Sequence, residues 1–208
     1  MRLFSTSCVL VTILWAPLVY CNDAANVTKS STIPAIVVKP KPTCLGEFCF
    51  DQKSPLISEE DFVKRYGEGY TQGGEFAYHC YEVPEQKLFV HFWPYHANQR
   101  EIMEIFVSDV PNCLTAKPPK TAFQPLITTE GLKIGDTYEK VVSLYGKPDV
   151  TRKANGLEKI GLDVDKAKKS APFGNKFLSY WPDKNALLHA DIYFRNGKVA
   201  AILISVHP

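Results

Sequence analysis

The sequence carries almost no net charge and none of the short motifs that commonly mark a catalytic or metal site. Its 208 residues include 24 lysines and arginines against 22 aspartates and glutamates, so the formal net charge is only +2. A charge this small provides no long-range attraction for nucleic acid or for an anionic membrane surface. The C-x-x-C and H-E-x-x-H spacings of zinc sites are missing, as is the G-x-S-x-G turn that presents a hydrolase serine. We therefore expect no cofactor, no nucleic-acid partner and no catalysis.

The N-terminal hydrophobic run is too short to cross a bilayer comfortably. It covers residues 8–20 and follows the positively charged Arg2, a pattern typical of a signal peptide. We predict a signal peptide over residues 1–21, with cleavage near Cys21. The alternatives are an uncleaved anchor and a lipid anchor at Cys21, and the bulky Tyr20 disfavours the second. The mature chain is then expected to be secreted or periplasmic, without a transmembrane span.

Export would place the remaining cysteines in an oxidising compartment, where an even number favours disulfides. The chain has six cysteines, two of which lie in the predicted signal peptide; the other four are Cys44, Cys49, Cys80 and Cys113. Three pairings are open, and we favour Cys44–Cys49 with Cys80–Cys113 because each bridge then closes locally. The alternative is a metal site in which Cys80 joins nearby histidines, namely His79, His91 and His96.

Two stretches of the mature chain show neither helical nor strand periodicity. Residues 22–43 are rich in Ser, Thr, Pro and Lys, and we predict a flexible tether there; it contains Asn26 in an N-glycosylation sequon. Residues 111–130 include two consecutive prolines and are predicted to form a linker. The segments 44–110 and 131–208 are the predicted structured parts of the mature chain.

The two segments resemble each other in three blocks that occur in the same order, which indicates a tandem duplication. The first pair of blocks is an amphipathic helix, the second is an aromatic strand ending in Trp-Pro, and the third is a further strand. The matched blocks are 60–67 with 139–146, 89–94 with 177–182, and 104–109 with 191–196. The alternative is chance similarity between amphipathic segments.

Each segment is interpreted as one helix followed by an antiparallel meander. Ser58 is predicted to cap the first helix and Asp136 the second, while Gly67 and Gly146 end them. The Asn-Gly dipeptide at 196–197 predicts a hairpin turn before the last strand. The expected fold class is α+β: two tandem helix-plus-meander repeats with joined sheets and the helices on one face.

Residues 131–149 follow the pattern Gly-hydrophobic-x-hydrophobic-Gly, helix, Gly-x-Pro. This pattern resembles the opening of small exported bacterial domains, among them the SmpA/OmlA-type outer-membrane lipoproteins and the β-lactamase inhibitor proteins. The inhibitor family is also similar in being a tandem repeat whose two sheets join, so the resemblance implies a fold more than a function. The first segment departs from the pattern, because Phe50 and Asp51 replace the Ile-Gly-Asp step and residues 52–57 precede the cap. No inhibitory residue can be carried over.

A basic insertion in the second segment is the candidate binding site. We expect a partner-binding loop held by a rigid sheet, and a solvated loop is the alternative. The cationic residues proposed for it are Arg152, Lys153, Lys159, Lys166, Lys168 and Lys169. Aromatic strand residues could add an exposed recognition face or could form the core; these are Tyr78, Tyr81, Phe92, Tyr95, Tyr180 and Tyr193.

A hydrolase is the catalytic alternative. His189 and Asp191 lie two residues apart on a predicted strand and would share a face, so with Ser179 they could form a triad. A solvated histidine and aspartate is the simpler interpretation. The sequence therefore favours a non-catalytic extracytoplasmic protein-binding or envelope-associated module. The alternatives are a secreted hydrolase of unknown substrate and a structural surface protein.

Overall fold

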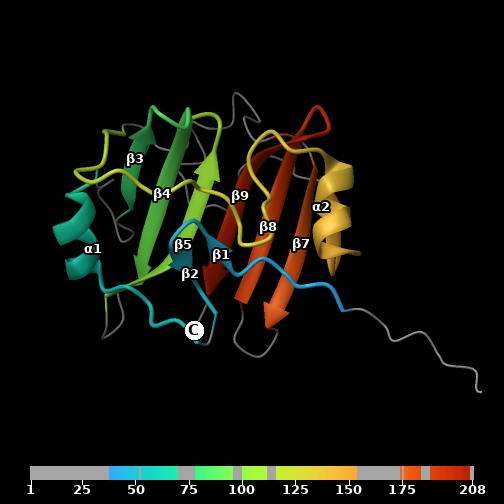
Figure 1. Ribbon diagram of the computed structural model, residues 1–208, viewed down its shortest axis with the longest axis horizontal. Coiled ribbons are helices and arrows are strands. Elements are labelled where there is room, and N and C mark those ends of the chain that lie inside the picture. Colours follow the sequence, from blue (N-terminus) through green and yellow to red (C-terminus); the bar gives the residue numbers. More distant parts are fainter. Residues whose placement is uncertain are drawn as a thin grey trace, which may run out of the picture. The chain divides into compact units, whose positions relative to one another are not determined.

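In the computed structural model the described residues form an α+β fold with two helices and two antiparallel sheets (Figure 1). The residues that it describes are 38–51, 53–69, 78–95, 100–111, 116–153, 174, 176–183 and 188–206. The predicted signal peptide, the sequon at Asn26 and most of the predicted tether lie outside this set. Among the described residues, no helix combines the length and the hydropathy that a membrane span requires.

The first helix, α1 (Glu59–Tyr66), is closed at both ends by local interactions. The Ser58 hydroxyl accepts a hydrogen bond from the Asp61 amide at 3.1 Å, which confirms the predicted cap. At the other end Gly67 adopts a φ of 80°, a left-handed conformation that suits glycine, and its amide donates to the Val63 carbonyl. The helix therefore begins and ends where its sequence signals predict.

The second helix, α2 (Tyr138–Tyr145), begins one residue later than predicted. Thr137 is its N-cap, with a hydroxyl that accepts from the Lys140 amide at 3.3 Å. The prediction that Asp136 caps the helix is wrong. Its carboxylate instead accepts a hydrogen bond from the Lys133 amide at 2.9 Å, in the turn before the helix. Asp136 and Thr137 are both residue types that can cap a helix. Asp136 stabilises the preceding turn, and Thr137 caps the helix.

The main sheet has seven antiparallel strands in the order β3-β4-β5-β9-β8-β7-β6 (Figure 1). Their bounds are β3 His79–Val83, β4 Leu88–Tyr95, β5 Glu101–Ser108, β6 Val150–Lys153, β7 Lys176–Asp183, β8 Leu188–Arg195 and β9 Lys198–Val206. The pairing of β5 with β9 joins strands from the two predicted segments into one sheet. Asn196 and Gly197 connect β8 to β9 with φ values of 54° and 75°, as a tight Asn-Gly hairpin turn requires.

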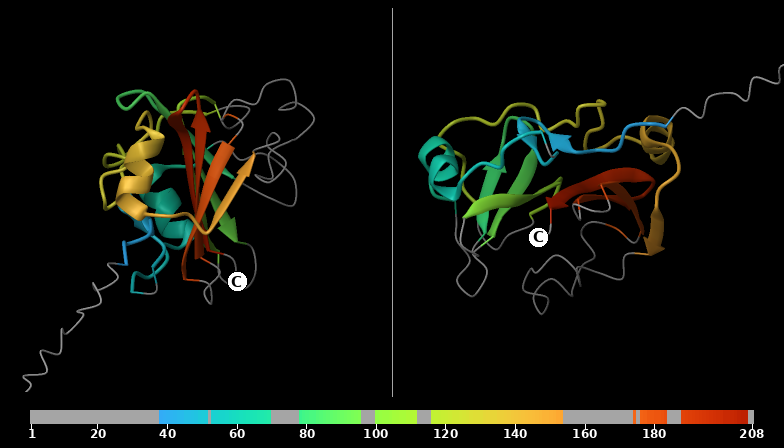
Figure 2. Two further views of the ribbon diagram at one scale, coloured as in Figure 1. Left: turned by 90° about the vertical axis from the view of Figure 1, so that its right-hand side faces the viewer. Right: turned by 90° about the horizontal axis from the view of Figure 1, so that it is seen from below.

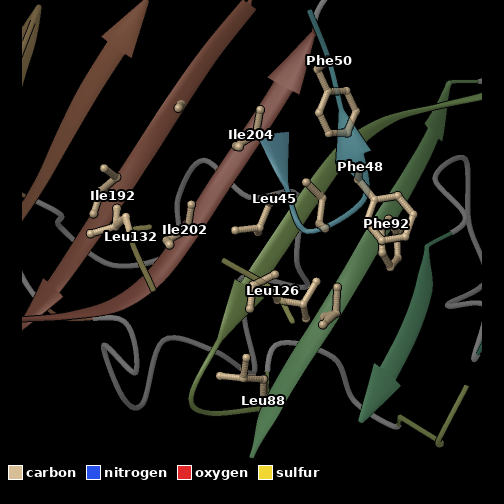
Figure 3. Close-up of a cluster of buried hydrophobic side chains, with 14 of the residues drawn as sticks. Leu45, Phe48, Phe50, Leu88, Phe92, Leu126, Leu132, Ile192, Ile202 and Ile204 are labelled. Atoms are coloured by element: carbon tan, nitrogen blue, oxygen red, sulfur yellow. The ribbon is translucent and has the colours of Figure 1, made fainter. Parts of the chain in front are cut away.

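The helices lie on one face of the main sheet, together with the small sheet of β1 (Cys44–Leu45) and β2 (Phe48–Cys49) (Figure 2). The core fills the space between these layers (Figure 3). Phe62 of α1 and Phe92 of β4 pack there with ring centroids 4.6 Å apart. Burial of such a side chain contributes roughly 2–3 kcal/mol. Neither α1 nor α2 covers the other face of the sheet, which we call the helix-free face and which carries a second, smaller apolar cluster.

The order of the strands does not fit the matched sequence blocks. Strands β3, β4 and β5 follow one another in chain order from one edge of the sheet towards its centre. Strands β6, β7 and β8 do so from the opposite edge. The matched strands nevertheless point the same way, because every neighbouring pair from β3 to β6 is antiparallel. A rotation that keeps the helices on one face and reverses the strand order must also reverse the strand directions. The matches of β4 with β7 and of β5 with β8 therefore cannot come from two rigid copies. A match of β3-β4-β5 with β7-β8-β9 reverses both the order and the directions, so the duplication itself stays a prediction.

The disulfide between Cys44 and Cys49 joins β1 to β2 and confirms one predicted bridge. Cys80 is also disulfide-bonded, while its predicted partner, Cys113, lies outside the described residues. A metal ligand must be a free thiolate, so the alternative metal site at Cys80 is wrong.

The predicted linker, and the described end of the predicted tether, also contact the folded part of the chain. Phe123 and Leu126, in the predicted linker, are buried in the core. Lys41, near the end of the predicted tether, forms a salt bridge of 2.5 Å with Asp149, ahead of β6. These segments thus cover and anchor the sheet as well as connecting its parts.

Candidate functional site

The helix-free face of the main sheet carries polar side chains at its centre. Successive strand residues point to opposite faces, so residues that alternate with the core residues collect here. Glu104 of β5 lies directly opposite Ser205 of β9, which in turn lies opposite His189 of β8. Ser179 of β7 lies opposite Asp191 of β8. The strand register therefore brings polar residues that are distant in the sequence onto one surface.

A pocket of about 490 Å³ lies over this polar region. Its polar lining consists of Glu104, Arg152, Ser179, His189 and Asp191. Aromatic rings from β7 and β8 complete much of the wall. The volume lies within the range of roughly 300–1,000 Å³ that is typical of ligand-binding pockets. We take this pocket as the candidate functional site.

Ser179 and Asp191 form a hydrogen bond in the floor of the pocket. The Ser179 hydroxyl donates to Oδ1 of Asp191 at 2.5 Å. His189 is half-buried, and its ring lies against Trp181 with centroids 5.8 Å apart. The structure thus brings the three residues of the candidate triad into one pocket. In a hydrolase triad the serine donates to the imidazole, whereas here it donates to the carboxylate, which does not activate it as a nucleophile.

His91 and Glu104 form the second buried polar pair on this face. His91 Nε2 lies 3.0 Å from Oε1 of Glu104, and the imidazole is 0% exposed. The ring stacks on Phe106 at a centroid distance of 5.1 Å and meets the edge of Tyr78 at 5.3 Å. These aromatic contacts fix the imidazole, so the position of the Glu104 carboxylate is fixed with it.

Two carboxylates, those of Glu104 and Asp191, line the pocket and influence nearby tyrosines. Burial raises the pKa of the Tyr193 hydroxyl, and the charges of Asp191 and Glu104 raise it further. Burial is also the main cause that raises the pKa of Tyr78 to about 12, and the charge of Glu104 is the second cause. A nearby negative charge disfavours the tyrosinate anion. Glu104 therefore acts on both tyrosines, and Asp191 acts on Tyr193.

The backbone of Trp181 is anchored at the pocket wall. Oδ2 of Asp149 accepts a hydrogen bond from the Trp181 amide at 2.9 Å and another from Lys41 at 2.5 Å. Lys41 also donates to the Trp181 carbonyl at 3.2 Å. The Asp149 amide in turn donates to the Ser179 carbonyl at 3.0 Å. Segments far apart in the sequence therefore together hold the backbone of Trp181 in place.

Only the beginning of the predicted basic loop belongs to the described residues. Arg152 lies on β6, is exposed and lines the pocket. Lys153 is the last residue of the same strand. Lys159, Lys166, Lys168, Lys169 and the side chain of Tyr95 lie outside the description. The structure therefore connects Arg152 with the candidate site and leaves the role of the other cationic residues a prediction.

The aromatic residues considered for an exposed recognition face are buried. Tyr81, Phe92 and Tyr180 belong to the core beneath the helices. Tyr78 and Tyr193 lie on the helix-free face and are also buried. An exposed aromatic face built from these five side chains is therefore wrong, and their interpretation as core is confirmed.

Two residues of the candidate site were missed by sequence reasoning. Glu104 interrupts an otherwise apolar strand, and such a break indicates a polar patch on the second face of a sheet. Trp181 was noted only as part of the repeated Trp-Pro block. Their meeting at one pocket depends on the β5–β9 pairing, which no local pattern predicts.

The chain matches no protein-family model, and no curated protein and no solved structure matches it significantly. The function must therefore be inferred from the geometry of the site.

Proposed function

We propose that the protein is an extracytoplasmic binding module without catalysis, and that it holds a protein partner at the pocket on its helix-free face. The observation that carries the proposal is this pocket of about 490 Å³, with Glu104, Asp191 and His189 in its floor and Arg152 and Trp181 at its wall. Tryptophan and arginine beside a concave site are typical of the energetic centre of a protein interface.

The rigidity of the site favours binding. Its residues lie on paired strands, and the Trp181 backbone is fixed by Asp149 and Lys41. A site that is already ordered loses less conformational entropy when a partner binds. An interface centred on this pocket is therefore expected to form without rearrangement of the sheet.

The extracytoplasmic location is part of the proposal. It is supported by the Cys44–Cys49 disulfide and by the signal-like residues 1–21. In this account the signal peptide is removed near Cys21 and the mature chain is secreted or periplasmic. Association with the envelope would then arise through the partner rather than through a lipid at Cys21.

Kinship with the SmpA/OmlA-type lipoproteins or the β-lactamase inhibitor proteins is a separate proposal. Its support is the motif at residues 131–149 and the arrangement of both helices on one face of an antiparallel sheet. A duplication shared with the inhibitor family would match β3-β4-β5 with β7-β8-β9, which differs from the matched sequence blocks. No partner is carried over from either family.

Site-specific photo-crosslinking tests the proposed function. A benzophenone amino acid is placed at position 152, beside the pocket, and in a matched variant at position 60 on α1; both positions are exposed. We expect a saturable protein adduct from position 152 in the secreted or periplasmic fraction, and none from position 60. Equal adducts from both positions, or no adduct from either, would contradict the proposal.

A hydrolase remains the second candidate because Ser179, His189 and Asp191 line the same pocket. The direct bond from serine to carboxylate weighs against it. Any hydrolytic activity found in the purified protein is expected to survive His189→Ala. Its abolition in that variant, with the fold intact, would favour the hydrolase.

A further inference from the structure

We propose that the pocket binds a cationic side chain, a lysine or an arginine presented by the partner protein, with the Glu104 carboxylate as its main counter-charge. This inference rests on the proposed function and specifies the chemistry of the partner. It follows from the charge of the pocket floor, the aromatic wall and the position of Arg152.

Glu104 is a buried carboxylate with unused capacity to accept hydrogen bonds. The residue is only 9% exposed, and it lines the pocket. Its Oε1 is bonded to His91, while no described residue donates to Oε2. A buried carboxylate gains strongly from a charged donor, because a hydrogen bond to an ionised group is stronger than a neutral one. A lysine or arginine that reaches Oε2 would supply that donor.

Asp191 adds a second negative charge to the same floor. It accepts a hydrogen bond from Ser179 and is 9% exposed. Both carboxylates act on the Tyr193 hydroxyl, so their fields overlap beside this ring. A cation that enters next to Tyr193 is attracted by both charges, and an anion is repelled by both.

The aromatic wall suits the long stem of a basic side chain. Phe177 and Tyr193 stack with centroids 5.2 Å apart, and Trp181 lines the same pocket. Lysine and arginine bury their methylene groups against apolar surface while the charged end reaches a polar group. An indole face also attracts a cation directly. The pocket thus offers contacts for both the stem and the head of such a side chain.

Arg152 limits which cations are accepted. It is exposed on β6, and its guanidinium repels an isolated cation but attracts a carboxylate. We therefore expect the partner to carry an acidic residue beside the inserted lysine or arginine. A protein segment with neighbouring basic and acidic side chains offers both charges at once.

The test uses N-butylguanidinium as the cationic probe and N-butylurea as its neutral isostere. The full chain is labelled with 5-fluorotryptophan and titrated by ¹⁹F NMR, and the Trp181 signal is assigned with Trp181→Phe. We expect a saturable shift of the Trp181 signal with butylguanidinium and at least tenfold weaker binding of butylurea. Either equal binding of the two probes or no saturable shift would overturn the inference.

Glu104→Gln is the decisive variant because the glutamine carbonyl can still accept the bond from His91. It is expected to weaken butylguanidinium binding at least tenfold, whereas Glu60→Gln, exposed on α1, is expected to have no effect. An unchanged affinity in Glu104→Gln overturns the inference. Thermal unfolding checks the fold, and Asp191→Asn, expected to weaken binding at least threefold, replaces Glu104→Gln if that variant does not fold.

The two proposals fail in different ways. If position 152 captures a partner whose affinity is insensitive to Glu104→Gln, the cationic inference is overturned and the protein-binding function stands. If no position captures a partner, the proposed function is overturned whatever the probes show.

Discussion

The Tyr81 hydroxyl donates a hydrogen bond of 2.6 Å to the carbonyl of Gly67, the residue that ends α1. Tyr180 makes the same contact, at 3.2 Å, with the carbonyl of Gly146 at the end of α2. Carbonyl groups at a helix C-terminus have no partner within the helix. A tyrosine from the sheet satisfies one of them in each case and ties both helices to the strands beneath.

Removing these hydroxyls should destabilise the fold to different extents. Tyr81→Phe is expected to lower the free energy of unfolding by about 1–2 kcal/mol, because it leaves a partly buried carbonyl without its donor. Tyr180→Phe is expected to cost less, since its hydrogen bond is longer. Urea denaturation followed by circular dichroism measures both values. A larger loss for Tyr180→Phe would show that these bonds do not tie the helices as described.

The Cys44–Cys49 bridge should stabilise the layer that covers the core. Replacing both cysteines by serine is expected to lower the free energy of unfolding by about 2 kcal/mol, as a short closed loop predicts. Leu45, between them, is fully buried, and Leu45→Ala is expected to cost about 3 kcal/mol. Thermal unfolding under oxidising and reducing conditions provides the comparison. If reduction leaves the wild-type midpoint unchanged, the bridge has no stabilising role.

Stability should decline at alkaline pH. Burial raises the pKa of Tyr78 and of Tyr180 to about 12, against about 10 in the unfolded chain. The folded state therefore keeps these hydroxyls protonated at pH values where the unfolded chain releases the protons. The resulting stabilisation is fully present below about pH 10 and is lost as the pH rises towards 12. Denaturation at a series of pH values tests this, and Tyr180→Phe should flatten the curve.

Lys41→Met should loosen the pocket wall without unfolding the protein. The side chains of Lys41 and Asp149 are 26% and 20% exposed, so their salt bridge contributes less than about 1 kcal/mol. The Trp181 amide should nevertheless exchange its hydrogen faster, because the anchor at the adjoining carbonyl is gone. Lys39→Met is the control, since that ammonium reaches Ser143 on α2 instead. Identical Trp181 exchange in wild type and Lys41→Met would rule out the anchoring role.

Local features of this fold could be predicted because they depend on neighbouring residues. Ser58 and Gly67 enclose α1, and Asn196-Gly197 forms the hairpin turn, each as its residue type indicates. The failure at Asp136 is also local, since Thr137 beside it is an equally good cap. Matching sequence blocks correctly located the helices and strands, but the strand order excludes the specific matches of β4 with β7 and of β5 with β8.

The candidate site could be predicted only in part because its assembly is long-range. The shared face of His189 and Asp191 followed from their spacing, whereas the bond between Ser179 and Asp191 depends on the register of two strands. Arg152 was included as part of a basic loop, with no sign that it lines a pocket. The contact of Lys41 with Trp181 spans 140 positions of the chain, a separation that no sequence period encodes.

The affinity of the partner captured at position 152 shows whether the helix-free pocket is the binding site. Its dissociation constant is measured for the wild type, for Trp181→Ala at the pocket wall and for Glu60→Ala on α1. The account predicts that Trp181→Ala raises the dissociation constant at least tenfold, a loss of about 1.4 kcal/mol, and that Glu60→Ala leaves it unchanged. Equal dissociation constants for all three proteins would show that the helix-free pocket is not the binding site.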